Sequence, residues 1–386
     1  MNRGLKVAYS LPVPVRIRPL SSLWPDLVTA LKTRVSGRPR RDDALSMLAN
    51  QHRLDPILAR NVETSPLLGG TLQRIDGQGA SAATDIVTEW ICPPVLLCRV
   101  RRGLINLATG IVYDPQARKY LLETCWGWAK YTTASVRLYN RRAHRTAPGT
   151  PVYVFAGCGY HGIVEDLSAI LLLREQGHEF RILVDGRNQW MLGLLALFLP
   201  PSVEVIRAPA GSWIEAADEM LIVTKSAFGE FVHPQLLEAL RRAARRIPGR
   251  SPLGSRLFIS RADTPNRAHG SEDQLAAPFV ERGFNRVRLS ELSVGEQVLA
   301  FQHATDVAGL HGAGFTNLVW SQTQVRIDEL YSPQYYNSCY VCLAHTLGHL
   351  YANHRLTADP AADAAALAAA LQARSWATRT TNRGQP

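Results

Sequence analysis

A glycine-rich turn, His311-Gly312-Ala313-Gly314, is the segment of the sequence best suited to hold a phosphate group. It follows an apolar stretch, 306–310, and precedes Thr316 and Asn317, either of which could start a helix or touch the phosphate. A strand that ends in glycines and leads into a helix directs free backbone N–H groups at one point, where an anion is stabilised. We therefore predict a phosphate cradle in which His311 also donates to a phosphate or sugar oxygen. A tight structural turn is the alternative.

Two arginines and a glutamate are placed to complete this cradle. Arg261 and Arg267 follow a strand predicted over 257–260, and fixed guanidinium groups stabilise the charge that develops on a departing diphosphate. Glu329 stands near the end of a strand predicted over 325–330, at the sheet edge where open α/β folds bind ligands. Its carboxylate could accept hydrogen bonds from ribose hydroxyls or cap a neighbouring backbone group, and the arginines could instead be solvated.

A second group of titratable side chains follows the glycine-rich loop 157–162. His161 and Glu165 are four residues apart and share one face of a helix that starts near Tyr160. Either of them, or Asp166, could serve as the general base that takes a proton from a hydroxyl group. The alternative is an ordinary helix N-terminus, where the helix dipole favours acidic side chains.

A series of short elements resembles glycosyltransferase family 61 in both order and spacing. In this sequence the series is Ile259-Ser260-Arg261, Arg267, Glu272, Gly283-Phe284, Glu296-Gln297, His311 to Gly314 and Glu329-Leu330. The resemblance extends from about residue 151 to about residue 351. Two positions depart from the family pattern: Ser271 replaces the asparagine before Glu272, and Gly162 replaces a bulky residue after His161.

The resemblance implies an α/β, GT-B-like fold in which two Rossmann-like, doubly wound domains face a cleft. It also implies an inverting, metal-independent hexosyl- or pentosyltransferase that needs no cofactor. The enzyme would move a sugar from a nucleotide-diphosphate sugar, with UDP-sugar favoured, to a glycan acceptor during surface polysaccharide assembly. The donor would lie against Arg261, Arg267, His311, Gly312, Ala313, Gly314, Thr316, Asn317 and Glu329, and the catalytic residues would come from His161, Glu165 and Asp166. A catalytically inactive transferase-like fold that binds nucleotide, glycan or nucleic acid is the alternative.

Alternating strand and helix patterns support the α/β class independently of the resemblance. Strands are predicted over 152–156, 180–184, 203–207 and 221–224, and again over 257–260, 285–289, 306–310 and 325–330, with helices between them. Earlier strands over 95–100 and 110–113 could pair as a hairpin. We predict an N-terminal extension without an assigned role (1–90), an acceptor-side domain (91–247), a nucleotide-sugar-binding domain (256–355) and a C-terminal helix with its tail (356–386).

Two helix starts carry capping signals. Ser293 and Glu296 have the spacing of a capping box, in which each side chain binds the backbone of the other residue. Asp359 precedes Pro360, the combination expected at an N-cap and the first helical position. We therefore predict helices that begin directly after Ser293 and after Asp359.

The composition sets bounds on the function. At 386 residues, 46% hydrophobic and 19% charged, the chain can bury two cores and is not of the disordered type. The net charge of +11 comes mainly from arginine, and without interleaved aromatic residues we do not expect nucleic acid as a partner. The sequence shows no signal-peptide pattern and no apolar run long enough to span a membrane. We therefore expect a cytoplasmic protein, with peripheral contact at the inner face of the membrane as a further option.

Cys339, Cys342, His345 and His349 are too closely spaced for a zinc finger, so we expect structural roles for them.

Overall fold

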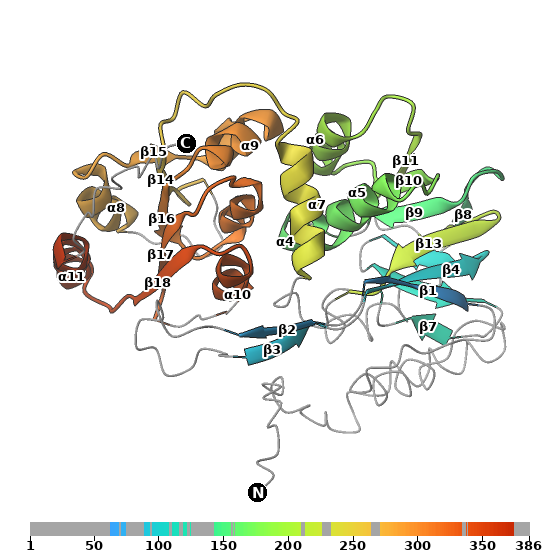
Figure 1. Ribbon diagram of the computed structural model, residues 1–386, viewed down its shortest axis with the longest axis horizontal. Coiled ribbons are helices and arrows are strands. Elements are labelled where there is room, and N and C mark those ends of the chain that lie inside the picture. The colour runs from blue at the N-terminus through green and yellow to red at the C-terminus, as the bar shows by residue number, and fades with distance from the viewer. Residues whose placement is uncertain are drawn as a thin grey trace, which may run out of the picture.

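The computed structural model describes residues 62–68, 71–74, 89–92, 95–107, 110–115, 119–121, 124, 143–155, 157, 159–209, 213–225, 233–263, 271–333, 337 and 339–373 of the 386-residue chain. These residues form a mixed α/β structure with one six-stranded sheet, two five-stranded sheets and one two-stranded sheet (Figure 1). The predicted α/β class is confirmed. Within the described ranges, no helix is long and apolar enough to cross a membrane.

The six-stranded sheet contains four parallel strands and an antiparallel extension. Its order is β1 (Val62–Leu68), β4 (Val95–Arg101), β13 (Glu219–Val223), β9 (Val152–Phe155), β10 (Arg181–Asp185) and β11 (Val205–Ala208). Strands β13, β9, β10 and β11 are parallel, whereas β4 runs antiparallel to both β13 and β1. The chain starts the parallel set at β9, moves outward through β10 and β11, and then returns to the other side of β9 as β13. The strand order therefore reverses between β9 and β13, which is where open α/β sheets bind ligands.

One of the two five-stranded sheets is entirely parallel. Its order is β15 (Asn285–Val287), β14 (Arg256–Ile259), β16 (Asp306–Leu310), β17 (Arg326–Tyr331) and β18 (Leu350–Arg355). In chain order this is 2-1-3-4-5, the flavodoxin-like arrangement, with its switch point between β14 and β16. One face packs into the larger core through Ile259, Val307 and Ile327, and the other packs on α8 (Glu272–Val280) and α11 (Pro360–Ala373) through Phe258 and Leu330.

The strand pairing in the other five-stranded sheet contradicts one prediction, the hairpin. It is ordered β7 (Lys119–Leu121), β6 (Ile111–Asp114), β5 (Leu104–Asn106), β12 (Trp213–Glu215) and β8 (His144–Arg145). The predicted hairpin between 95–100 and 110–113 is wrong, because β4 belongs to the six-stranded sheet and β6 pairs with β5 and β7. The short strand β5 lies between them in the chain, and Gly110, directly before β6, has a φ of 71°, which favours glycine. The remaining pair, β2 (Thr71–Arg74) and β3 (Glu89–Cys92), forms the two-stranded sheet.

The capping signals place helix starts as predicted. Helix α9 (Val294–Gln302) begins after Ser293, and the reciprocal capping box between Ser293 and Glu296 is present. Asp359 accepts hydrogen bonds from the backbone N–H groups of Ala361 and Ala362 at 3.0 and 3.1 Å, so it caps α11. The other helices are α4 (Gly159–His161), η4 (Gly162–Leu167), α5 (Ser168–Glu175), α6 (Gln189–Phe198), α7 (Pro234–Ala244), η5 (Leu289–Glu291), η6 (Ala313–Trp320) and α10 (Cys339–Thr346).

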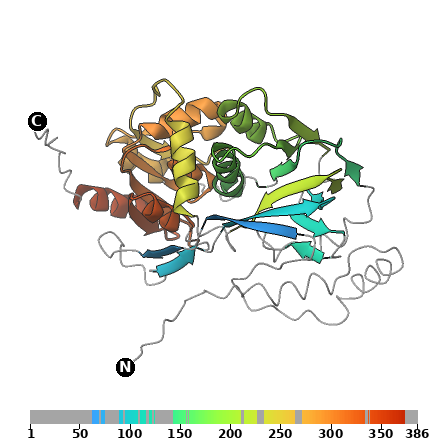
Figure 2. The ribbon, with the colours of Figure 1, turned by 45° about the vertical axis from the view of Figure 1, so that its right-hand side comes forward.

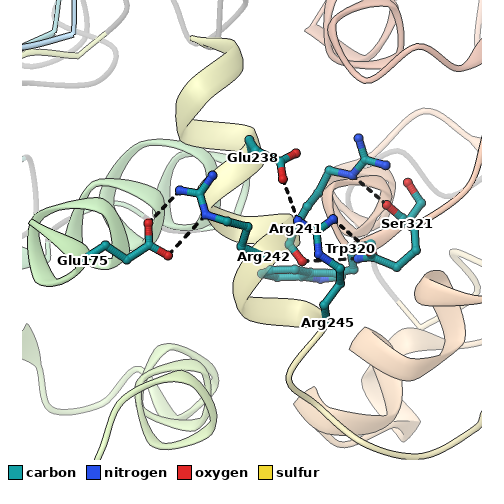
Figure 3. Close-up of polar contacts among 8 residues, drawn as sticks. Glu175, Glu238, Arg241, Arg242, Arg245, Trp320 and Ser321 are labelled. Carbon is teal, nitrogen blue, oxygen red and sulfur yellow. Dashed lines mark hydrogen bonds and ion pairs between the residues drawn. The ribbon is translucent and has the colours of Figure 1, made fainter.

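Helix α7 lies between the six-stranded sheet and the parallel five-stranded sheet in both ribbon views (Figures 1 and 2). Arg242 on α7 pairs with Glu175 of α5 at 2.6 Å, on the side of the six-stranded sheet. On the other side, Arg241 Nε donates to the carbonyl oxygen of Ser321, directly after η6, at 3.0 Å (Figure 3). The arginines of α7 therefore link α5, beside the six-stranded sheet, to the end of η6, beside the parallel five-stranded sheet.

One hydrophobic core continues from one sheet to the other. Leu221 on β13 and Val307 on β16 belong to the same cluster of buried side chains. Half-buried Phe198, at the end of α6, packs against this cluster and stacks on Trp320 at the end of η6, with ring centroids 5.1 Å apart. The two sheets are thus joined by side-chain packing as well as by the segment between α7 and β14.

Candidate functional site

The loop after β9 turns into a helix with an unusual first section. Gly162–Leu167 forms a π-helix, and the N–H of Ser168 donates to the carbonyl oxygen of Ile163, five residues earlier. Ser168 Oγ also donates to the carbonyl oxygen of Val164 at 2.7 Å, which satisfies a group left over by the wider turn. Such π sections are frequent at functional sites. This one carries Glu165 and Asp166, and His161 precedes it directly.

His161 and Glu165 form a hydrogen-bonded pair. His161 Nδ1 lies 3.0 Å from Glu165 Oε2, and the side chains are 22% and 5% exposed, respectively. A buried carboxylate on one ring nitrogen fixes the orientation and tautomer of an imidazole. The pair can therefore present His161 as a proton acceptor, with Glu165 as the residue that orients it.

Asp166 is engaged differently from these neighbours. Its carboxylate accepts a hydrogen bond from Gly157 N at 2.8 Å and forms a buried ion pair with Lys225, which follows β13. Burial raises the pKa of the Asp166 carboxyl, and the Lys225 ammonium opposes that rise. Asp166 therefore joins the loop after β9 to the end of β13, and these contacts favour a structural role over the predicted role of general base.

Two glycines allow the loop after β9 to press against the helix. A Cβ at Gly157 would lie 2.7 Å from Gly162 N, and a Cβ at Gly162 would lie 3.1 Å from Gly157 O. Real Cβ atoms are not accommodated at the first distance without backbone movement. The departure from the family pattern at Gly162 therefore has a packing reason: a bulky side chain at this position would meet the backbone of residue 157.

Arg261 and Gly312 meet at the switch point of the parallel sheet. Arg261 follows β14, and Gly312 follows the neighbouring strand β16. A Cβ at Gly312 would lie only 1.6 Å from Arg261 Nη1, so the guanidinium group crosses the space that a side chain would fill. The predicted association of Arg261 with the His311–Gly314 turn is thus present in the structure. Arg267, the second predicted guanidinium, lies outside the described residues.

Glu272 fixes the turn that carries Arg261. The buried Glu272 carboxylate accepts hydrogen bonds from Arg261 N at 2.8 Å and from Ser260 Oγ at 2.5 Å. Arg286 pairs with the same carboxylate at 2.7 Å. The family motif residue Glu272 therefore positions the backbone at Arg261, and it does so from inside the protein.

His311 and Glu329 form a second histidine–carboxylate pair, on adjacent strands β16 and β17. His311 Nδ1 lies 2.5 Å from Glu329 Oε1, and both side chains are buried. The hydroxyl groups of Tyr331 and Tyr351 lie 2.9 and 2.5 Å from Glu329 Oε2. Glu329 is fully buried with contacts to both oxygens, so the geometry does not favour the predicted contact with ribose hydroxyls.

The remaining predicted donor residues lie in η6. Thr316 and Asn317 are buried: Thr316 Oγ1 lies 3.3 Å from the Tyr340 hydroxyl, and Asn317 Oδ1 accepts from Trp320 Nε1 at 2.9 Å. Their contacts thus stabilise η6 and do not favour binding of a phosphate. Ala313 is exposed at the start of η6.

The loops after β9 and β16 come together. A Cβ at Gly159 would lie 3.7 Å from the Cβ of Ala313, which is ordinary contact. The Tyr160 ring meets the Tyr340 ring edge-on at 5.7 Å, and Tyr340 lies 5.3 Å from the His311 ring. The two histidine–carboxylate pairs therefore belong to one region, connected through Tyr160 and Tyr340. Neither tyrosine was predicted; the position of Tyr160 next to His161 was the available signal.

The cysteine and histidine cluster near α10 takes part in packing. Cys342 is buried, and His349 Nδ1 accepts from Val325 N at 3.2 Å while Nε2 donates to Ser321 Oγ at 2.8 Å. Burial, as the main cause, lowers the pKa of His349 to about 4. Among the described residues, no group of three or more His, Cys, Asp or Glu side chains is placed to hold a metal ion.

A comparison with protein families supports the resemblance. A family model described as Glycosyltransferase 61 matches residues 160–327. The matched range begins at Tyr160 and contains the π-helix, Arg261 and the His311–Gly314 turn, and it ends two residues before Glu329. The search of curated proteins found no match to the chain.

Proposed function

We propose that this chain, whose residues 160–327 belong to glycosyltransferase family 61, transfers a sugar from a nucleotide-sugar donor to a hydroxyl group of a glycan. The family supports the general activity of a glycosyltransferase with a sugar donor and a glycan acceptor. The nucleotide, the stereochemistry and the reaction steps below are our proposal.

The observation that carries the proposal is the meeting of two switch points. One, between β14 and β16, holds Arg261 across Gly312 and precedes the N-terminus of η6. The other, between β9 and β13, leads to the His161–Glu165 pair. The approach of Gly159 to Ala313 and the contact between the Tyr160 and Tyr340 rings bring the two together, as a reaction between a donor and an acceptor requires.

In this mechanism the switch point between β14 and β16 binds the donor diphosphate. Arg261, His311 and the backbone N–H groups of the 312–314 turn would hold its charge, with Arg267 as a further candidate from the sequence. No metal ion is invoked, because fixed cationic groups would balance the charge of the leaving diphosphate. A UDP-sugar is the favoured donor.

The switch point between β9 and β13 would activate the acceptor. His161, oriented by Glu165, takes the proton of the acceptor hydroxyl as its oxygen attacks the anomeric carbon. The bond from that carbon to the diphosphate breaks at the same time, and the diphosphate leaves with the electron pair. Because attack and departure are on opposite sides, the anomeric configuration inverts.

The proposed arrangement corresponds to a GT-B-like plan. Residues 91–247 would form the acceptor side and residues 256–355 the donor side, with the C-terminal helix in 356–386. We place the activity in surface polysaccharide assembly in the cytoplasm, with peripheral contact at the inner face of the membrane. The strand orders of the two sheets, each reversing beside its candidate residues, support this plan.

The test is thermal stabilisation by UDP, GDP, CDP and their sugars, with and without EDTA. A ligand at 100 times its dissociation constant adds about 2.7 kcal/mol to stability. We expect one nucleotide series to stabilise the wild type, Arg261→Ala to remove the effect, and Arg250→Ala, at an exposed linker arginine, to retain it. His161→Ala should still bind the nucleotide but lose transfer. Absence of stabilisation by every nucleotide would reject the donor site and favour an inactive fold that binds another ligand.

A further inference from the structure

We propose that Glu329, together with Tyr331 and Tyr351, is a positioning residue for His311, and that His311 donates a hydrogen bond from Nε2 to the sugar-linked β-phosphate of the donor. This inference rests on the proposed function. It adds which phosphate His311 binds and which residues hold the imidazole for that contact. The Glu329 carboxylate is held in place, it orients the His311 ring, and that ring stands beside Arg261.

The carboxylate of Glu329 is held by two tyrosine hydroxyls. Both lie within hydrogen-bonding distance of Oε2, at 2.9 Å for Tyr331 and 2.5 Å for Tyr351. Burial and then the charge of Glu329 raise the pKa of both hydroxyls, so they keep their protons and can act as donors. Oε1, the other oxygen, faces His311. A buried carboxylate costs much free energy unless it is paired, so this arrangement needs a strong partner at Oε1.

His311 supplies that partner and is fixed by it. Nδ1 lies 2.5 Å from Oε1, and the ring stacks on Tyr331 at 5.0 Å with a 27° angle between planes. Tyr340 contacts the same ring at 5.3 Å. Position, plane and the role of Nδ1 are therefore set by neighbours, which leaves Nε2 on the side of the ring away from Glu329.

The proposed ligand follows from the surroundings of the ring. With the Glu329 carboxylate at Nδ1 and an anionic phosphate at Nε2, each ring nitrogen would face an oxygen acceptor to which it can donate. Arg261, which crosses Gly312 next to His311, supplies a second cation at the same strand ends. The diphosphate gains charge as the sugar departs, so a contact at the β-phosphate strengthens in the transition state.

The experiment compares nucleoside diphosphates with their monophosphates by isothermal titration, using the uridine, guanosine and cytidine pairs. For the pair that binds wild type, we expect Glu329→Gln and His311→Gln each to lower the ratio of diphosphate to monophosphate affinity by about tenfold. Affinity for the monophosphate should change by less than about twofold, since it lacks the β-phosphate. The double variant should lose no more than either single variant, because Glu329 acts through His311.

A matched control lies one residue away. Asp328, on the opposite face of β17, pairs with His354 Nε2 at 2.7 Å, so Asp328→Asn breaks a similar pair outside the site. It should lower stability and leave the affinity ratio at the wild-type value. If Glu329→Gln fails to fold, Tyr351→Phe, which removes one hydroxyl from Oε2, should lower the ratio severalfold.

The outcomes separate the two proposals. A wild-type affinity ratio in folded Glu329→Gln would overturn the positioning role and leave the donor site intact. The same holds for a wild-type ratio in Tyr351→Phe, if Glu329→Gln does not fold. Fully additive losses in the double variant would also overturn the positioning role. If no nucleotide of the three pairs binds wild type, the proposed function and this inference fail together.

Discussion

Replacing Gly312 with alanine should push the Arg261 guanidinium group out of the proposed diphosphate site. An ideal Cβ at residue 312 lies 1.6 Å from Arg261 Nη1 and 2.6 Å from Cζ. Since non-bonded heavy atoms approach to about 3.5 Å, the end of the arginine side chain must move by about 2 Å. The backbone at Gly312 is extended, with φ 172°, so alanine itself causes no backbone strain there. The effect should therefore fall on Arg261.

The size of the effect follows from the displaced contact. A movement of about 2 Å breaks a hydrogen bond, and hydrogen bonds to charged groups contribute about 1.5–3 kcal/mol. Affinity for the nucleoside diphosphate should fall by about 10- to 150-fold. The free energy of unfolding should change by less than about 1 kcal/mol, because a flexible side chain can turn aside without repacking the core.

Gly314→Ala is the matched control, two residues further on. A Cβ at Gly314 would lie 2.9 Å from both Ile259 Cγ2 and Leu289 Cδ1, so it meets packed apolar atoms. We expect overpacking to cost about 1–3 kcal/mol of stability, a loss that Gly312→Ala should not show. The two variants thus separate damage to the site from damage to the fold.

The assay is isothermal titration with the nucleoside diphosphate that stabilises the wild type, together with urea unfolding. Gly312→Ala combined with Arg261→Ala should bind no more weakly than Arg261→Ala alone, because the first change acts through Arg261. Wild-type affinity in a folded Gly312→Ala variant would refute the assignment of Arg261 as a ligand of the diphosphate.

Two further predictions concern stability. His349, whose pKa is lowered to about 4, takes up a proton on unfolding between about pH 6.5 and about pH 4. The free energy of unfolding should therefore fall by roughly 3 kcal/mol as the pH falls through this window. Urea unfolding at several pH values should show a shallower fall for His349→Gln, and an unchanged slope would contradict this assignment. Lys225→Met should cost about 3–5 kcal/mol by leaving the buried Asp166 without its partner. Adding Asp166→Asn should recover most of that loss in the same measurement; a double variant as unstable as the single one would exclude the ion pair as the cause.

Local signals explain why much of the α/β pattern could be predicted. The strand at 306–310 was predicted with the boundaries that β16 has, because a continuous apolar run ends at a glycine turn. The helix after Ser293 followed from a capping box, which needs only two residues at fixed spacing. By contrast, β18 was missed: Leu350–Arg355 is mostly half-buried or exposed, and its polar side chains hide the strand pattern.

Only those residues of the candidate site that directly follow a predicted strand could be placed from the sequence. The association of Arg261 with the turn after β16 was predicted from the order of the family elements, with Arg261 directly after one predicted strand and His311 directly after another. The partners of Glu329 did not, because the approach of Tyr351 depends on the pairing of β17 with a strand that the pattern did not show. Asp166 likewise acquires Lys225 from a position 59 residues later, a contact that no local spacing encodes.

The shared hydrophobic core has a consequence for cooperativity. Leu221, Trp320 and Val307 come from elements around both sheets but belong to one buried cluster, and Phe198 packs against it. Separating the sheets would expose this cluster to water, at a cost of about 25 cal/mol for each Å² of apolar surface uncovered. We therefore expect thermal unfolding to proceed as a single transition. A nucleotide bound at one switch point would then protect the whole molecule, including the half that it does not touch.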